Sequence, residues 1–335
     1  MPQQKTITIV GATGTQGSSV ARTFLSLPNW HVRCITRDTT SPRATSLSTL
    51  GATIIQADLN DLTSLKTAFA NTHAIFVNTD FWGLYRATPP SSSSSRSAFA
   101  QEIQQGKNAA LAASTIPTLE RYIYSALGPM KKHSKGKYPH SYHWDSKAEI
   151  VEFIETELPE LAKRTSFVYL GVYVSNPLFM PRVDHGGKLK FVIPLGKRVK
   201  IPVMDAGMAT GGFVRALVEE ETAGVKLLAC CGWLEVREMV DVWARVTGRE
   251  AEVVEVTPEW MRRELGIPME VLDAPAYIEE FGYMSGLEGV VEPGELRGRG
   301  LERWSFEDWL RGQDWEGILK AGMEELDGVK KEEVV

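Results

Sequence analysis

The chain contains 335 residues, of which 43% are hydrophobic and 24% are charged, and it carries a formal net charge of −5. These proportions are those of a soluble globular protein, and the length allows one large domain or two lobes. The acidic balance disfavours direct binding of nucleic acid, because phosphates are neutralised by a basic face.

The cysteines and histidines indicate neither a disulfide framework nor a metal site. The three cysteines are Cys34 and the neighbouring pair Cys230 and Cys231, so no C-x-x-C spacing exists. Neighbouring cysteines rarely pair, and the histidines show no metal-ligand spacing. We therefore expect no bound metal and a reducing compartment.

The first ten residues, MPQQKTITIV, lead directly into an apolar, β-branched run. They lack the apolar core of a signal peptide, and no apolar run in the chain reaches the roughly 18 residues of a membrane span. We therefore expect a cytoplasmic protein without a membrane contact, located in the cytosol alone or in the cytosol and the nucleus.

Strands and helices are predicted to alternate over the first 170 residues. Apolar and β-branched runs predict the strands, and apolar residues at helical spacing predict the helices. In chain order these elements are strand Thr6–Val10, helix Ser18–Leu27, strand His31–Thr36, strand Ala52–Gln56, helix Leu62–Ala70, strand Ala74–Asn78, helix Phe99–Ala113, strand Arg121–Ser125, helix Asp145–Glu157 and strand Thr165–Tyr169. This order builds a parallel sheet from right-handed βαβ crossovers, so the fold class is α/β with a Rossmann-type doubly wound parallel sheet.

The alternation fades after residue 175, where prolines punctuate short apolar pieces. Helices are still predicted over Gly211–Glu220 and Leu234–Thr247. We assign residues 1–175 to a dinucleotide-binding domain and residues 176–335 to a smaller mixed α/β C-terminal lobe for a substrate or a partner, with the chain crossing between the two.

Residues 88–97, TPPSSSSSRS, are predicted to form a polar low-complexity loop. The loop follows the fourth strand, at the edge where ligands bind in such sheets. It is either a lid over the site or a tolerated insertion. The whole segment 81–98 is expected to become ordered when a ligand binds, with Phe81, Trp82 and Tyr85 as the docking groups.

The strongest motif is a glycine-rich turn that follows the first strand and opens a helix. Its glycines allow a tight turn, a close approach of pyrophosphate to the backbone and close packing of the helix on the strand. The helix N-terminus then attracts phosphate. The residues are Gly11, Ala12, Thr13, Gly14, Thr15, Gln16 and Gly17.

The residues after the second and third strands indicate which dinucleotide binds. Arg37 stands 20 positions beyond Gly17, where an acid would bind the ribose of NAD and an arginine favours the 2′-phosphate of NADP. Asp38 is adjacent to Arg37 and leaves two alternatives to a phosphate site. Its carboxylate could bind the ribose, or the two residues could form a simple solvated Arg–Asp pair. Asp58 and Leu59 follow the third strand and are expected to contact the adenine.

Motifs spread along the chain resemble the NmrA-like family of atypical short-chain dehydrogenases, in its fungal branch. They are GATGTQGSSV, ITRD, ADLND, FVNTDFW, QGKNAALAA, RYIYSALGP, HWDSKAEIVEFI, GVYVSN and SFEDWL. The G-x-x-G-x-x-G spacing of the first motif is the variant typical of such proteins.

The resemblance implies an NADP(H) site that extends beyond the glycine turn. Lys107, in QGKN, matches a lysine that neighbours the cofactor in relatives. A segment that starts after Gly171, where relatives usually carry proline, matches the part that closes over the nicotinamide. The implied cofactor-binding residues, besides Gly11–Gly17, are Arg37, Asp38, Asp58, Leu59, Asn78, Thr79, Asp80, Lys107, Lys147, Tyr173, Val174, Ser175 and Asn176.

The resemblance also points to a catalytic group that departs from the family pattern. Short-chain dehydrogenases use Tyr-x-x-x-Lys and a serine from the preceding strand, but this chain has His143 where the tyrosine stands. Lys147 is retained, as a ribose clamp or a general base, and Ser125 occupies the place of the serine. His143 is either a proton donor, since imidazole exchanges protons near neutral pH, or a non-catalytic wall residue. Tyr142 is one position out of register, about 100° away on a helix.

Two functions follow from these features. The first is an NADPH-dependent oxidoreductase that reduces a small hydrophobic carbonyl, quinone or conjugated alkene, as in secondary metabolism, with Phe81, Trp82, Tyr85, Phe179 and Met180 as candidate pocket residues. The second is a non-catalytic NADP(H) redox sensor that regulates a protein partner such as a transcription factor. The sequence leaves the substrate and the oligomeric state open.

Overall fold

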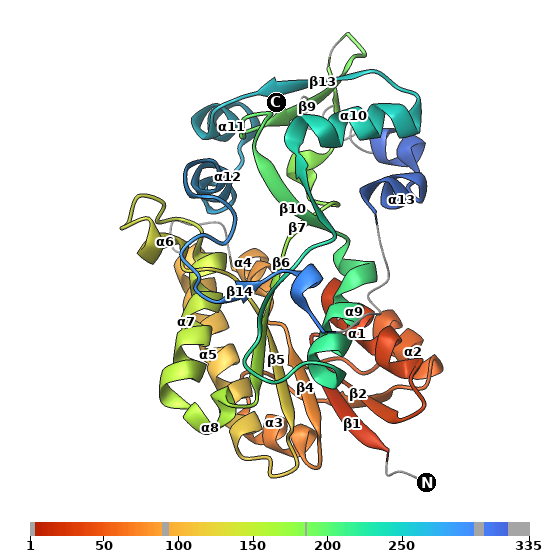
Figure 1. The fold of residues 1–335 in the computed structure, drawn as a ribbon, viewed down its shortest axis with the longest axis vertical. Helices are drawn as coiled ribbons and strands as arrows, with labels where there is room; N and C mark the ends of the chain where they lie inside the picture. The colour runs from red at the N-terminus through yellow and green to blue at the C-terminus, as the bar shows by residue number, and fades with distance from the viewer. Residues whose placement is uncertain (1–3, 89–93, 185, 298–304, 321–335) are drawn as a thin grey trace. The chain divides into compact units, whose positions relative to one another are not determined.

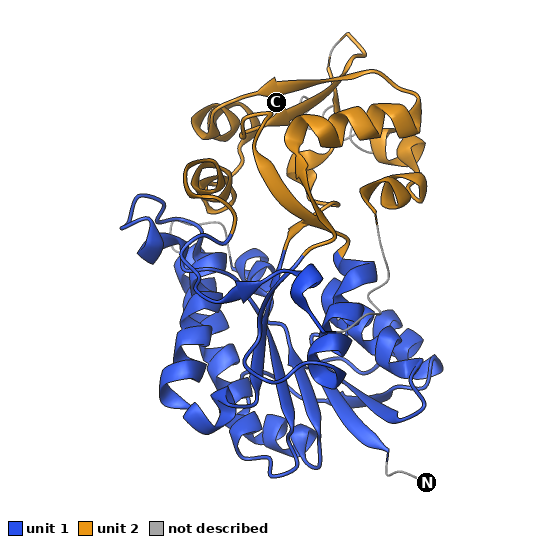
Figure 2. Cartoon of the chain, in the orientation of Figure 1, with its two compact units in different colours: residues 1–170, 206–229, 284–302 blue, residues 171–205, 230–283, 303–335 orange. Residues whose placement is uncertain are grey.

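The computed structural model describes residues 4–88, 94–184, 186–297 and 305–320. Within these ranges, no helix combines the length and the apolarity that a membrane span requires. The chain divides into two compact units, which Figure 2 colours separately. Unit 1 comprises residues 1–170, 206–229 and 284–302, and unit 2 comprises residues 171–205, 230–283 and 303–335. The region expected to form the second lobe therefore also supplies two segments of unit 1.

Unit 1 is built on an eight-stranded parallel sheet in the order β14-β11-β6-β5-β4-β1-β2-β3 (Figure 1). Its strands are β1 (Lys5–Val10), β2 (Trp30–Thr36), β3 (Thr53–Gln56), β4 (Ala74–Val77), β5 (Arg121–Ala126), β6 (Thr165–Leu170), β11 (Lys226–Ala229) and β14 (Val290–Val291). The predicted Rossmann-type fold is confirmed, and β11 and β14 extend the sheet beyond the strands that the sequence predicted.

Helices cover both faces of this sheet, as buried parallel strands require. The helix α1 packs against α9 on one face and α5 packs against α7 on the other (Figure 1). The helices of unit 1 are α1 (Thr15–Leu25), α2 (Pro42–Thr49), α3 (Leu62–Phe69), α4 (Phe81–Ala87), α5 (Ser94–Ser114), α6 (Met130–His133), α7 (Tyr142–Glu157), α8 (Pro159–Ala162) and α9 (Ala206–Glu219).

The polar segment 88–97 is shorter as a loop than predicted. Residues 94–97 already belong to α5, and Phe81–Ala87 forms α4, while residues 89–93 lie outside the described part of the chain. Ser94 and Ala98 are buried. Tertiary packing of this first turn therefore outweighs the weak helix propensity of serine.

The order of the strands locates the ligand edge of the sheet. From β1 the chain runs outward through β2 to β3, and it then returns to the other side of β1 to form β4. Ligands of doubly wound sheets bind at the carboxyl ends of the strands that flank such a reversal. In this chain those ends are followed by Gly11, after β1, and Asn78, after β4.

Unit 2 contains two small sheets and, among its described residues, four labelled α-helices and a further helical stretch over residues 315–320. The first sheet has the order β12-β10-β7, and the second has the order β13-β9-β8. The strands are β7 (Val172–Tyr173), β8 (Arg182–Val183), β9 (Leu189–Ile193), β10 (Lys200–Met204), β12 (Gly232–Glu235) and β13 (Ala251–Glu255). The helices are α10 (Val236–Thr247), α11 (Pro258–Leu265), α12 (Met269–Phe281) and α13 (Phe306–Arg311).

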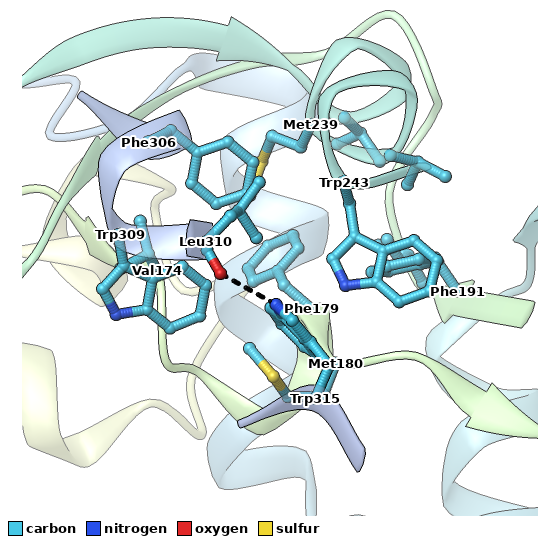
Figure 3. Close-up of a pocket in the computed structure, with 13 residues that line it drawn as sticks. Val174, Phe179, Met180, Phe191, Met239, Trp243, Phe306, Trp309, Leu310 and Trp315 are labelled. Atoms are coloured by element: carbon cyan, nitrogen blue, oxygen red, sulfur yellow. Dashed lines mark hydrogen bonds between the residues drawn. The ribbon is translucent and has the colours of Figure 1, made fainter. Parts of the chain in front are cut away.

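An aromatic core holds unit 2 together (Figure 3). The ring of Trp243 meets Phe191 at 5.4 Å and Trp315 at 5.6 Å between centroids, and the indole of Trp315 donates a hydrogen bond to the carbonyl of Leu310. The cavity among these side chains encloses about 10 Å³, which is room for about one water molecule. Phe179 also lines this cavity. We therefore interpret it as a core residue of unit 2.

Candidate functional site

The glycine turn has the geometry of a phosphate cradle. Gly11 adopts a φ of +76°, and its carbonyl accepts a hydrogen bond from the backbone N–H of Gly14. A Cβ on Gly17 would lie 2.2 Å from the Gly11 carbonyl oxygen, so only glycine fits there. The helix α1 then begins without an acidic residue in its first turn and without a side-chain cap. Its N-terminus therefore presents backbone donors and a positive dipole end to an anion.

The carboxylate beside Arg37 is engaged in its own turn. Asp38 Oδ1 accepts hydrogen bonds from the backbone N–H of Thr40 at 2.8 Å and from its hydroxyl at 2.6 Å. The Thr40 hydroxyl and backbone bonds lower the pKa of Asp38. Arg37 itself is exposed, and its carbonyl accepts a bond from Gln56. The turn therefore presents an arginine, with the neighbouring acid folded onto Thr40.

A second arginine, which was not predicted from the sequence, lies at this turn. Arg43, in the first turn of α2, donates from Nη1 to the carbonyl of Thr13 in the glycine turn, at 3.3 Å. The helix α2 is started by Ser41, whose hydroxyl accepts from the backbone N–H of Ala44. Arg43 stands six positions after Arg37. Ser41 and Pro42, between them, are a typical helix start, and this signal could have predicted that Arg43 lies in the first turn of a helix beside the glycine turn.

The end of β4 is bound to a buried lysine. Lys147 Nζ, on α7, donates to the Thr79 hydroxyl at 2.9 Å, to the Thr79 carbonyl at 3.1 Å and to Asn78 Oδ1 at 3.2 Å. It also forms an ion pair at 3.3 Å with Glu102 of α5, which is fully buried. The Ser146 hydroxyl donates to the other oxygen of Glu102. Because Lys147, Glu102, Ser146 and Thr79 are buried, the pairing is needed to offset their loss of hydration.

Neither Glu102 nor Ser146 was identified from the sequence. A weak signal for a buried glutamate was present, because Glu102 occupies a position on α5 whose buried neighbours are mostly small residues. Asp80, by contrast, is exposed and caps α4 by accepting from the backbone N–H of Gly83. Of the predicted group 78–80, the structure thus brings Asn78 and Thr79 together with Lys147.

His143 lies in an aromatic cluster on the same unit. Its ring is 4.9 Å from that of Trp82 and 5.8 Å from that of Phe81, and Tyr85 packs on Phe81 at 6.1 Å. Phe81 is buried, whereas Trp82 and Tyr85 are half-buried. Three of the five candidate pocket residues therefore gather around the histidine that replaces the family tyrosine.

Other predicted residues lie apart from this cluster. Ser125 is buried within β5, opposite Val168 of β6. Lys107 Nζ lies over the Phe153 ring at 5.0 Å, on a surface groove along α5 and α7 that Tyr142 and Asp145 also line. The off-register tyrosine therefore faces this groove.

Two further structural facts concern chemistry at the groove and at the thiols. Burial raises the pKa of Asp145 to about 6, and its Oδ1 accepts from the backbone N–H of Lys131. Burial likewise raises the pKa of Cys34 and of Cys231 to about 12, so these thiols are poor nucleophiles at neutral pH. Within the residues the structure describes, no group of three or more histidine, cysteine or acidic side chains is placed to hold a metal ion.

The segment 173–176 belongs to unit 2. Val174 is buried in the aromatic core, and Asn176 Oδ1 accepts from the backbone N–H of Leu178. A Cβ on Gly171 would lie 2.7 Å from the carbonyl oxygen of Pro202, which leaves no space for the proline of relatives. The contact of Tyr173, Val174, Ser175 and Asn176 with a nicotinamide stays a prediction.

Curated fungal proteins resemble the chain over different lengths. The NmrA-like family domain-containing oxidoreductase himF of Aspergillus japonicus is 49% identical over 74 residues, which is 22% of each chain. The corresponding oxidoreductase ptmS of Penicillium ochrochloron is 25% identical over 276 residues, 77% of each chain. The nitrogen metabolite repression protein nmrA of Emericella nidulans is 29% identical over 213 residues, 61% of this chain and 54% of that protein. Two of these matches thus span less than two thirds of the relative's length.

Solved structures share the fold at low identity. NmrA, a negative transcriptional regulator, in complex with NADP, has a TM-score of 0.70 and 21% identity, and the match covers 95% of this chain and 98% of that one. The leucoanthocyanidin reductase of Vitis vinifera, in complex with NADPH, has a TM-score of 0.69 and 17% identity, with 91% and 98% covered. The model of the NmrA-like family matches residues 3–303, which is nearly the whole chain and includes every part of the site described above. The chain therefore belongs to the NmrA-like family.

Proposed function

We propose that this chain is an NADP(H)-dependent oxidoreductase that reduces a small hydrophobic carbonyl compound, quinone or conjugated alkene. One observation carries the proposal: a glycine turn shaped for a diphosphate lies beside two arginines, while the nearest carboxylate is folded onto its own turn. An NAD site would instead offer that carboxylate to the ribose hydroxyls.

The residues present fit a dinucleotide with a 2′-phosphate. The uncapped N-terminus of α1 would hold the diphosphate, and Arg37 with Arg43 would hold the 2′-phosphate through charge-assisted hydrogen bonds. Asn78 and Thr79, at the carboxyl end of β4, would face the nicotinamide half. The NADP and NADPH complexes of the structural neighbours support this choice, although NmrA is also known in complex with NAD.

The chemistry is divided between the cofactor and the chain. Bound NADPH would supply the hydride, which reduces the substrate carbon. His143 would give the proton to the substrate oxygen, and the rings of Trp82 and Phe81 hold its imidazole in place. Together with Tyr85, these rings form an apolar, aromatic lining, which suits a hydrophobic conjugated substrate. Lys147 would contribute a fixed positive charge beside Thr79.

The test is turnover with a panel of quinones, enones and aromatic aldehydes, followed through NADPH absorbance. We expect consumption of NADPH with at least one class, and its loss in His143→Ala and Lys147→Ala. His140→Ala is the matched control, because this histidine is exposed and lies three positions upstream of His143, before the start of α7. Full activity of His143→Ala would remove that residue from the proposed chemistry.

A redox sensor is the second candidate, and the histidine at position 143 favours it. A protein that lacks the usual tyrosine can bind the cofactor without turning it over, and the structural neighbour NmrA is a negative transcriptional regulator. Burial raises the pKa of Cys34 and of Cys231, which favours a response through the bound cofactor over one through these two thiols. Tight binding of NADP(H) without turnover on any substrate of the panel would favour this candidate over the enzyme.

A further inference from the structure

The helix α5 buries three polar side chains in succession on one side. Glu102, Gln105 and Asn108 are 0%, 6% and 8% exposed, and they recur every third residue. At 1.5 Å per residue, the first and the last are about 9 Å apart along the helix axis. Buried polar groups are costly unless they are paired, so each of them is expected to hold a specific partner.

At one end of this row, α5 holds the loop that follows β3. Asn108 Nδ2 donates to the carbonyl of Leu59 at 2.8 Å, and Gln105 Nε2 donates to Asn60 Oδ1 at 3.2 Å. Gln104 Nε2 in turn donates to Asn108 Oδ1 at 2.9 Å, which fixes the orientation of that amide. Loop 58–60 lies on the β1–β3 side of the sheet, the adenosine side of a doubly wound fold.

At the other end of the row, α5 holds the residues that follow β4. Glu102 accepts from Ser146 and pairs with Lys147, and Lys147 donates to Thr79 and Asn78. An ammonium has three N–H donors, and here it has four protein acceptors within 3.3 Å. Glu102 thus pairs with the ammonium of Lys147, and the hydrogen bonds that Lys147 donates fix the conformation of Asn78 and Thr79.

We propose that Glu102 and Asn108 are positioning residues for opposite halves of the dinucleotide site. Asn108 sets loop 58–60 for the adenosine half, and Glu102 sets Lys147, Asn78 and Thr79 for the nicotinamide half. This inference rests on the proposed binding of NADP(H), and it adds that one helix positions both halves of the site through different residues. It requires that each residue influence one half of the ligand and not the other.

Calorimetric titration with NADPH and with adenosine 2′,5′-bisphosphate, which contains only the adenosine half, tests the division. Asn108→Ala is expected to weaken both ligands by a similar factor, about two- to tenfold for one lost hydrogen bond. Glu102→Gln keeps the shape of the side chain and removes its charge. It is expected to weaken NADPH about tenfold or more, as for a hydrogen bond to a charged group, and to leave the bisphosphate unchanged.

Two further variants make the result specific. Ser146→Ala removes the hydroxyl that donates to Glu102, and it should weaken NADPH alone by a smaller factor, which also covers the case that Glu102→Gln does not fold. Glu221→Gln is the matched control: it is another buried glutamate of unit 1, but its carboxylate accepts from the backbone of Arg297. It should leave both affinities unchanged.

The outcomes separate this inference from the function on which it rests. If the native protein binds both ligands, the division between the two halves is overturned in either of two cases. In the first, Glu102→Gln weakens both ligands equally or weakens neither. In the second, Asn108→Ala leaves the bisphosphate unchanged. A native protein that binds neither ligand overturns the proposed function and the inference together. Loss of thermal stability without half-selective binding would assign Glu102 a purely structural role and would also overturn the inference.

Discussion

The substitution Lys147→Met should destabilise unit 1 strongly, because it leaves a carboxylate in the interior without its counter-ion. Glu102 is fully buried and would keep only the Ser146 hydroxyl as a partner. Breaking a buried ion pair by removing one member costs about 3–5 kcal/mol. For a unit of roughly 150–250 residues this corresponds to a fall in the melting temperature of roughly 6–20 °C.

The double variant Glu102→Met/Lys147→Met separates the charge from the packing. Replacing both members of a buried pair by apolar side chains of similar size is often neutral. Here we expect only partial recovery, because Thr79 and Asn78 also lose their donor. Thermal unfolding followed by circular dichroism, without cofactor, measures both variants. A Lys147→Met protein that melts within about 2 °C of the native protein would refute this reasoning, since a shift that small corresponds to less than about 1 kcal/mol.

Four other measurements follow from the structure. Arg37→Ala should weaken NADPH about tenfold to a hundredfold and leave NADH nearly unchanged, the loss expected for a charge-assisted phosphate contact; equal affinity of the native protein for both dinucleotides would contradict this. Gly14→Val should abolish cofactor binding in a folded protein, whereas Gly17→Val should not fold, because its Cβ has no space; calorimetry and circular dichroism distinguish the two. Burial raises the pKa of Asp145 from 3.8 to about 6, so the stability that its protonated form contributes is present below pH 3.8 and lost as pH rises through 6. Asp145→Asn should reduce this pH dependence of the free energy of unfolding by up to about 2 kcal/mol, allowing for solvent screening. Urea unfolding at pH 4–7 measures it, and a variant with the same pH profile as the native protein would contradict the prediction. Hydrogen exchange over Phe81–Ala87 should slow when NADP(H) is added, and unchanged protection would remove α4 from the site.

The sequence was sufficient for features that depend on neighbouring residues. The glycine turn between a strand and a helix is one of them. Its requirements, a positive φ at Gly11 and the absence of a Cβ at Gly17, both lie within seven residues. The alternation of strands and helices is another, because the periodicity of buried positions is local. The parallel sheet and the edge at which we place the candidate site followed from these two signals.

The parts that were missed depend on contacts between distant residues. Glu102 and Lys147 are 45 positions apart, and nothing local to either one indicates that they form a buried pair. The strand β11 was missed for a related reason: its four residues become a strand by pairing with Phe167–Leu170 of β6. The start of α5 was misassigned because its serines are typical of loops, although Ser94 is buried by packing.

The interleaving of the two units has a consequence for how the protein can be produced and folded. The segment 1–175, taken as an autonomous piece, would end with β6 as an open edge of apolar residues, because β11 and β14 come from later in the chain. Exposed apolar edges pair with other chains and aggregate. It would also lack α9, which covers α1 behind the glycine turn. During synthesis the edge of β6 is covered only after β11, which ends at Ala229, has left the ribosome, so the nascent chain carries that open edge for about 60 residues and is exposed to misassembly over this interval.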